Sequence, residues 1–214
     1  SISKLSTKIV VEVPIIENGN TNDINGFFSI QHTTHFSANS LLNCFTLAGW
    51  KIEKKYKASD YNGYRVVASP QSNIDSGIVL KQEKEDWIKL NSSLLSWYEA
   101  IEVVENIVQD IPECNHFVIW GGGAHTEYLY QTTSFFHIHH QSRFIIVDSD
   151  PLKHGKTWRG IPIHEPSIIK DLDWSSINLL ISSYGGQESI AEEANKLGIP
   201  DANVIKLYKT IRRY

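Results

Sequence analysis

Hydrophobic runs bounded by turn residues predict the elements of the first 70 positions. Lys8 to Pro14, KIVVEVP, is a β-branched run stopped by proline and predicts a buried strand. Ser37 stands at an N-cap position before a run with one apolar helical face, and Gly49 follows at the C′ position. Two further strands are predicted at 50–57 and 64–69, joined as a hairpin. This part of the chain therefore reads as strand, helix, strand, strand.

The middle of the chain has a different pattern. After a polar, turn-rich stretch at 70–77, apolar and aromatic residues recur at helical spacing and predict a long amphipathic connector of one or two helices. Packing between domains explains these aromatic residues better than a ligand-binding face. The residues are Trp87, Leu94, Tyr98, Ile101, Val104 and Val108.

From His116 onward, strand and helix patterns alternate. The parts, in order, are strand FVIW, a glycine loop, a helix, strand RFIIVD, short strand IPIH, strand NLLIS, helix ESIAEEANKLG and strand NVIKLY. Such alternation predicts a parallel sheet with helices on both faces. We therefore expect an α/β protein with three parts: a first domain at 1–70, a helical connector at 71–113 and a three-layer αβα domain at 114–214.

Composition limits the function classes. The 214 residues are 41% hydrophobic and 21% charged, with a net charge of −4, and the basic residues are scattered. This balance favours a small-molecule ligand over nucleic acid or a membrane surface. Cys44 and Cys114 stand outside any CxxC spacing, so neither a disulfide framework nor a thiolate zinc site is expected. We expect a cytoplasmic location. The chain contains no methionine, and we expect it to be part of a longer protein.

Three glycines carry the first candidate chemistry. Gly121, Gly122 and Gly123 follow an apolar strand and open a helical segment, so their backbone N–H groups could face a phosphate or carboxylate. Thr126 stands where a dinucleotide fingerprint has its third glycine, while Asp148 ends the next strand, where a ribose-binding acid would lie. The alternative is that the glycines only make a tight turn.

Two groups of histidines are candidates for a metal site or for acid–base catalysis. His137, His139 and His140 could suggest a metal, but a solvated loop explains them more simply and no metal site is expected. His32 and His35 precede the helix that begins after Ser37, where a histidine can act as a general base near neutral pH. A hydrogen-bonded residue at the helix entry is an equal alternative for both.

The order of several motifs resembles one known family. VEVP, FFSIQHTTHFSANSLLNCFTLAGW and NGYRVVASP resemble the end of the class I methyltransferase fold in sugar C-methyltransferases, which has a V-E-V-P strand, a Y-x-E-H-x-x-Y-F-S loop, a helix and a final hairpin. WGGGAH, VDSDPLKHGKTWRGIPIHEP and LLISSYGGQESI resemble that family's carboxy-terminal Rossmann-like domain. The resemblance implies a partial class I methyltransferase sheet followed by that domain.

The resemblance also implies site residues. His32 matches the histidine of the family's catalytic loop, the suspected base in methyl transfer. Its neighbours depart from the pattern: Gln31 replaces Glu, Ser29 replaces Tyr, and His35 replaces an aromatic residue. A neutral amide stands in place of the carboxylate that would polarise His32, which argues against carbon deprotonation and leaves an oxygen acceptor or a different sugar open. Catalytic roles are thus expected for His32, Gln31 and His35, with Ser29 at the substrate.

In the second half, the resemblance implies that the glycine loop and its surroundings help to seat a nucleotide-linked sugar or a similar substrate. The expected substrate-binding residues are Gly121, Gly122, Gly123, His125, Asp148 and Lys153. The family's cofactor is S-adenosylmethionine, whose main binding loop would precede Lys8 in a missing amino-terminal part. The present chain alone is therefore expected to be inactive. A homodimer is compatible with this reading.

Two other functions stay open. The chain could be a stand-alone nucleotide- or sugar-binding module in which the first half only packs against the second. An NAD-dependent oxidoreductase is a weaker alternative, because the third glycine is missing and no catalytic Tyr-Lys or Cys pair is evident.

Overall fold

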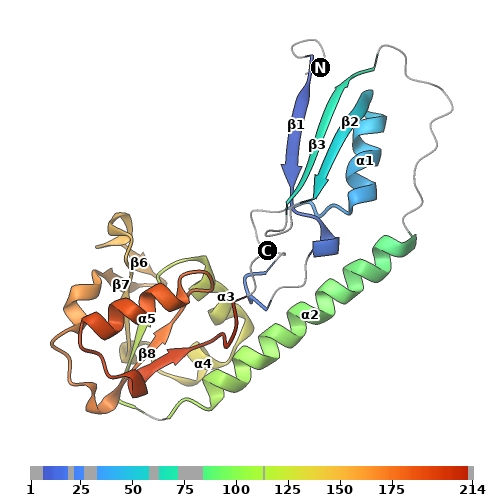
Figure 1. Ribbon diagram of the computed structural model, residues 1–214. Helices are drawn as coiled ribbons and strands as arrows, with labels where there is room; N and C mark the ends of the chain where they lie inside the picture. The colour runs from blue at the N-terminus through green and yellow to red at the C-terminus, as the bar shows by residue number, and fades with distance from the viewer. Residues whose placement is uncertain are drawn as a thin grey trace. The chain divides into compact units, whose positions relative to one another are not determined.

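The computed structural model forms two compact units, shown in Figure 1. The structure describes residues 7–18, 22–26, 33–57, 63–71, 84–112 and 114–211. Unit 1 comprises residues 1–21, 26–98 and 212–214, and unit 2 comprises residues 22–25 and 99–211. The short segment Asn22–Asn25 thus belongs to the second unit although it lies early in the sequence.

Unit 1 contains a three-stranded antiparallel sheet with strand order β1-β3-β2. Its elements are β1 (Ile9–Val13), α1 (Ala38–Leu47), β2 (Trp50–Lys57) and β3 (Tyr64–Pro70). The predicted succession of strand, helix, strand and strand is confirmed. The last strand pairs with both others, so that Val66 lies opposite Val11 and, on its other side, Lys55.

The ends of α1 follow from local chemistry. The Ser37 hydroxyl accepts a hydrogen bond from the backbone N–H of Ser40 at 2.9 Å, and the Ser40 hydroxyl accepts one from the N–H of Ser37 at 2.8 Å. This reciprocal capping satisfies donors that an α-helix leaves without intrahelical partners. After the C-cap Ala48, Gly49 adopts the left-handed conformation with φ of 76°, as predicted for the C′ position.

The core of unit 1 lies between α1 and its sheet. Side chains of Leu41, Leu42 and Phe45 on α1 pack with Trp50, Val66 and Ala68 of β2 and β3. The apolar face predicted for the helix is therefore the face that it buries.

The connector is a single helix, α2 (Lys84–Gln109), of 26 residues. Its residues up to Tyr98 belong to unit 1, and those from Glu99 onward belong to unit 2. Val104 and Val108, at i and i+4 on one face, are buried, as their spacing predicts. The packing expected for Trp87 and Tyr98 is wrong, because these side chains are 65% and 61% exposed.

Unit 2 is a mixed α/β domain around a six-stranded sheet with order β6-β7-β5-β4-β8-β9. The predicted parallel sheet is confirmed for five strands, and only β6 runs antiparallel to its neighbour. The strands are β4 (His116–Trp120), β5 (Phe144–Val147), β6 (Thr157–Trp158), β7 (Ile161–His164), β8 (Ile177–Ile181) and β9 (Val204–Lys206).

Alternating side chains of the central strand β4 identify the two covered faces of this sheet. Val118 and Trp120 pack in one cluster with Ala194 of α5 (Gln187–Lys196). Phe117, the neighbour of Val118 in the strand, points to the opposite face. The centroid of its ring lies 5.1 Å from that of Phe135 in α4 (Phe135–Ile138). Helices on both faces give the Rossmann-like three-layer arrangement expected for this part of the chain.

The connections of unit 2 vary in form. Helix α3 (Ala124–Thr132) and α4 link β4 to β5, and α5 links β8 to β9. The remaining connections use 3-10 turns and the β6–β7 hairpin, of which only the second strand was predicted. Within the described residues, the 3-10 helices are Ile16–Asn18, Gln141–Arg143, Pro151–Lys153, Pro166–Ile169, Trp174–Ser176 and Asp201–Asn203.

The hairpin has a specific backbone cause. Arg159 and Gly160 both have positive φ, 47° and 85°, between the two strands. Two successive left-handed residues are typical of the type I′ turn, whose twist matches that of antiparallel strands. The sequence does not indicate this turn, because Asn-Gly or Asp-Gly is usual at these two positions and the first of them is arginine here.

Candidate functional site

The glycine loop lies at the carboxyl end of β4, as predicted. Gly121 has φ of 125°, and a Cβ built there would lie 2.5 Å from the backbone oxygen of Ser182, which follows β8. A Cβ on Gly122 would lie 2.8 Å from Cδ1 of Ile163. Glycine is therefore required at the first position by backbone conformation and by the close backbone of Ser182, whereas at the second position a larger residue would have to displace the Ile163 side chain. The tight turn and the approach of the residue after β8 explain Gly121 without a ligand.

Asp148 joins the glycine loop to the end of β5. Its Oδ2 accepts a hydrogen bond from the backbone N–H of Gly122 at 2.7 Å and one from Nζ of Lys153 at 2.8 Å. Its Oδ1 accepts a third, from the N–H of Asp150 at 2.9 Å. Burial raises the pKa of Asp148, but these bonds outweigh it and hold the pKa below its usual range. The carboxylate is thus a charged, largely buried anchor for the loop.

Lys153 places a positive charge at the glycine loop. A Cβ built on Gly123 would lie 3.2 Å from Nζ of Lys153. The Lys153 side chain is 35% exposed, whereas that of its partner Asp148 is 10% exposed. The 3-10 helix Pro151–Lys153, capped by Asp150, sets the position of this lysine. Three sequence-predicted residues, Gly122, Asp148 and Lys153, are therefore brought into direct contact.

His125 lies in a different, buried cluster. It is in the first turn of α3, and its Nδ1 lies 3.0 Å from Oγ of Ser182, while Nε2 lies 2.6 Å from the hydroxyl of Tyr208. Asp23 Oδ1 is 3.9 Å from the same Nε2. Burial lowers the pKa of His125 to about 4, so the ring is neutral near pH 7.

The direction of each hydrogen bond in this cluster can be worked out from Thr126. The Thr126 hydroxyl contacts both the carbonyl oxygen of Gly121 and the hydroxyl of Ser182. A carbonyl can only accept, so Thr126 gives its single proton to Gly121 and accepts one from Ser182. Ser182 must then accept from Nδ1–H of His125, which leaves Nε2 to accept from Tyr208.

The direction of the hydrogen bond between His125 and Ser182 excludes Ser182 as a nucleophile activated by His125. A serine next to a histidine suggests a nucleophile with its general base, but the base must accept the serine proton. Here the ring nitrogen that faces Ser182 donates, and Ser182 is buried. The pair is therefore part of a satisfied structural network, and the sequence gives no local sign of it because its members are far apart in the chain.

In unit 1, His35 lines a small hollow of about 290 Å³. The hollow is also lined by Ile16, Ser37, Ser40, Asp86, Trp87 and Leu90. Asp86 is buried and accepts a hydrogen bond from the Ser37 hydroxyl, and Nζ of Lys89 lies 3.6 Å from its Oδ1. The structure thus adds a carboxylate from α2 to the neighbourhood of His35. Ser29, Gln31 and His32 lie outside the described residues, and their predicted roles stay predictions.

The three histidines after α3 have separate partners. Nε2 of His137 lies 2.9 Å from the carbonyl oxygen of Tyr130, Nδ1 of His139 lies 3.1 Å from Nη1 of Arg143, and Nδ1 of His140 lies 2.8 Å from the Ser142 hydroxyl. His137 is in the short helix α4, where a loop was expected. Within the described ranges, no group of three or more His, Cys, Asp or Glu residues could hold a metal ion.

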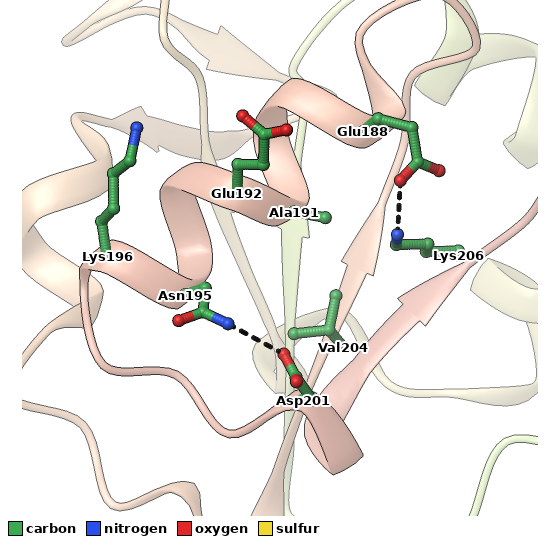
Figure 2. A pocket seen from close by; sticks show the side chains of 8 residues that line it. All are labelled: Glu188, Ala191, Glu192, Asn195, Lys196, Asp201, Val204 and Lys206. Carbon is green, nitrogen blue, oxygen red and sulfur yellow. Dashed lines mark hydrogen bonds and ion pairs between the residues drawn. The ribbon is translucent and has the colours of Figure 1, made fainter.

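A larger open groove of about 600 Å³ lies beside α5 and β9, and Figure 2 shows its lining. Charges of both signs face it. Nζ of Lys206 pairs with Oε2 of Glu188 at 2.6 Å, and Nδ2 of Asn195 donates to Oδ1 of Asp201 at 3.3 Å (Figure 2). The ion pair between Lys206 and Glu188 is exposed and is therefore typical of a solvated surface, and the lining as a whole has no excess of one charge.

Among the described helices, none is both long enough and apolar enough to span a bilayer. No protein-family model matches the chain, and no curated protein matches it. Two similar solved structures are of RSP, a Rex-family repressor. The first is 16% identical over 58% of this chain and 67% of that chain, with a TM-score of 0.31. The second, RSP in complex with beta-NAD+ and operator DNA, is 15% identical over the same shares, with a TM-score of 0.30.

Proposed function

We propose that unit 2 is a nucleotide-binding Rossmann-like module that holds the anionic part of a small ligand at the glycine loop. The strand order of unit 2 carries this proposal. From β4 the chain moves outward through β5 to β7, and it then returns to the other side of β4 with β8 and β9. In open parallel sheets, ligands bind at the carboxyl ends of the strands where this reversal occurs. Gly121 and Ser182 mark that point here.

The charges at the loop support an anionic ligand group. The first turn of α3 presents backbone N–H groups at the positive end of the helix dipole, and Lys153 adds a full positive charge beside Gly123. Asp148 holds Lys153 there. A phosphate that approaches from the solvent side would meet the partly exposed ammonium group before the buried carboxylate.

The experiment is isothermal titration of the 214-residue chain with AMP, for wild type, Lys153→Gln and the control Lys156→Gln. Lys156 is an exposed lysine three positions further along the chain, so both variants remove one positive charge from the same segment. We expect Lys153→Gln to weaken AMP binding by about tenfold or more, which is about 1.4 kcal/mol, and Lys156→Gln to leave it unchanged. Equal affinities of wild type and Lys153→Gln, or no binding by wild type, would contradict the proposal.

Unit 1 favours a second candidate, the carboxy-terminal portion of an S-adenosylmethionine-dependent methyltransferase that acts on a sugar-like small molecule. Its support is the succession β1, α1 and the β2–β3 pair, which is the order that the motif resemblance implies. His35 beside Asp86 adds acid–base groups at a hollow. If cofactor binding needs a glycine turn located before Lys8, the 214-residue chain should not bind S-adenosylmethionine in calorimetry. Micromolar binding by this chain would contradict that reading.

A further inference from the structure

The segment Asn22–Asn25, here called the strap, lies against the carboxyl ends of β8 and β9 within unit 2. Nδ2 of Asn22 donates to the carbonyl oxygen of Thr210 at 2.7 Å, and the Tyr184 hydroxyl donates to Oδ1 of Asn22 at 2.5 Å. The backbone N–H of Ile24 donates to the Tyr208 hydroxyl at 3.3 Å. Three hydrogen bonds thus join the strap to the residues that follow these two strands.

The strap and its partners have buried side chains at this part of the sheet edge. Asp23 is 4% exposed and Ile24 is fully buried. Tyr184 and Tyr208 are also buried, and their rings meet edge to face with centroids 4.7 Å apart. Ile24, Tyr184 and Tyr208 are therefore closed to solvent, and a ligand could contact them only if the strap moved.

The neighbouring part of the edge is open. Over β4 and β5, Gly122 and Gly123 are partly exposed, Ser149 is exposed and Leu152 is 76% exposed. Neighbouring strands are spaced about 4.8 Å apart, so β4, β5 and β7 present an edge roughly 10 Å wide, and β8 and β9 would extend it by about the same width. The strap lies against that second part of the edge, where it is hydrogen-bonded to Tyr184, Tyr208 and Thr210.

We infer that the strap sets the length of ligand that this site accepts: a mononucleotide fits the open edge over β4 and β5, whereas a dinucleotide requires the strap to leave. In two-part dinucleotide sites, the second nucleotide lies across the point where the strand order reverses. On the β8 and β9 side of that point, the second nucleotide would meet Tyr208, Ile24 and the buried His125 network. The inference rests on the proposed nucleotide-binding function and specifies the class of ligand for that same site.

Titration with two ligands that share one half tests the inference. AMP and NAD+ both contain adenosine monophosphate, so the strap should affect only the larger one. We expect wild type to bind AMP at least about tenfold more tightly than NAD+. Asn22→Ala removes the contacts to Tyr184 and Thr210, and should strengthen NAD+ binding while AMP binding stays the same. Tyr184→Phe, which removes one of those contacts, should act in the same direction with a smaller effect.

Asn195→Ala is the matched control, because Asn195 also makes a side-chain hydrogen bond but lies on α5, in the groove of Figure 2. Hydrogen exchange of the Ile24 amide reports the strap directly and should accelerate in Asn22→Ala but not in Asn195→Ala. Equal binding of AMP and NAD+ to wild type, with unchanged Ile24 exchange, would overturn the inference alone. A parallel gain for both ligands in Asn22→Ala would do the same. If neither ligand binds wild type, the proposed function fails, and the inference fails with it.

Discussion

The hydroxyl oxygen of Tyr208 lies 2.6 Å from Nε2 of His125, although 83 positions separate the two residues. The same oxygen accepts the N–H of Ile24. Tyr208→Phe would leave that donor and the ring nitrogen buried without their partner. We expect a loss of roughly 1–3 kcal/mol in the free energy of unfolding, measured by urea denaturation. Tyr56→Phe on exposed β2 should change stability by less than about 0.5 kcal/mol. Equal effects of both substitutions would contradict the network.

Neutral His125 makes stability depend on pH. Burial lowers its pKa to about 4 in the folded protein, against an unfolded value of 6.5. The unfolded state therefore binds the proton first as pH falls. The contribution is complete above pH 6.5 and declines from there to about pH 4, by roughly 3 kcal/mol at most. Urea unfolding across this range should show a steeper pH slope for wild type than for His125→Gln. Parallel slopes would mean that His125 is accessible to protons when folded.

Arg159 combines backbone strain with side-chain contacts. Its φ is 47°, its guanidinium lies 3.7 Å from the centre of the Tyr130 ring, and Nη2 pairs with Glu127 at 2.6 Å. Both members of the ion pair are 40% exposed, so the pair itself contributes less than about 1 kcal/mol. Arg159→Ala loses the contacts and keeps the strain, whereas Arg159→Gly loses the contacts and relieves it. The free energy of unfolding of Arg159→Ala should therefore be about 1 kcal/mol lower than that of Arg159→Gly in thermal or urea unfolding.

The Glu127 pKa provides a separate measurement on these variants. The hydrogen bond from Arg159 lowers the pKa of Glu127 to about 2. In both variants, an NMR titration should find this pKa much nearer to its ordinary range. An unchanged pKa would show that Arg159 does not contact Glu127 in solution, whatever the stability result.

Gly121 is the glycine at which substitution should cost most. Alanine there combines a φ of 125° with a Cβ only 2.5 Å from the Ser182 oxygen. We expect Gly121→Ala to destabilise unit 2 by about 2–3 kcal/mol or more, seen as a lower unfolding midpoint. Gly185→Ala is the control, because its Cβ would meet nothing within 4 Å and its φ is ordinary. A well-tolerated Gly121→Ala would mean that the end of β8 does not approach the loop.

Much of unit 2 could be predicted because its strands are short apolar runs between turn residues. All five residues of β8 are buried, and four of the five in β4 are, so each strand appears in the sequence as a nearly continuous apolar run. The contact between Asp148 and Lys153 was also predictable, while their role in substrate binding stays a prediction. They are only five positions apart, and the strand end and the 3-10 turn bring them together.

The strap and its partners could not be predicted in this way. Asn22 meets Tyr184 across 162 positions, and Asp23 and Ile24 lie in a polar stretch that reads as an ordinary loop. Local propensity does not indicate which distant strand end a loop will cover. The β6 strand was missed for a different reason: two residues are too few to show alternation, and Arg159 masks the turn.

The order of the strands in unit 2 also affects how the protein behaves at high concentration. The outermost strands are the short ones: β6 has two residues and β9 has three, while the long buried strands lie inside. A foreign strand that adds to either margin would gain few backbone hydrogen bonds, and at β9 it would also have to displace or desolvate the charged Lys206. The sheet therefore offers little template for edge-to-edge association into fibrils, even though its interior strands are strongly apolar.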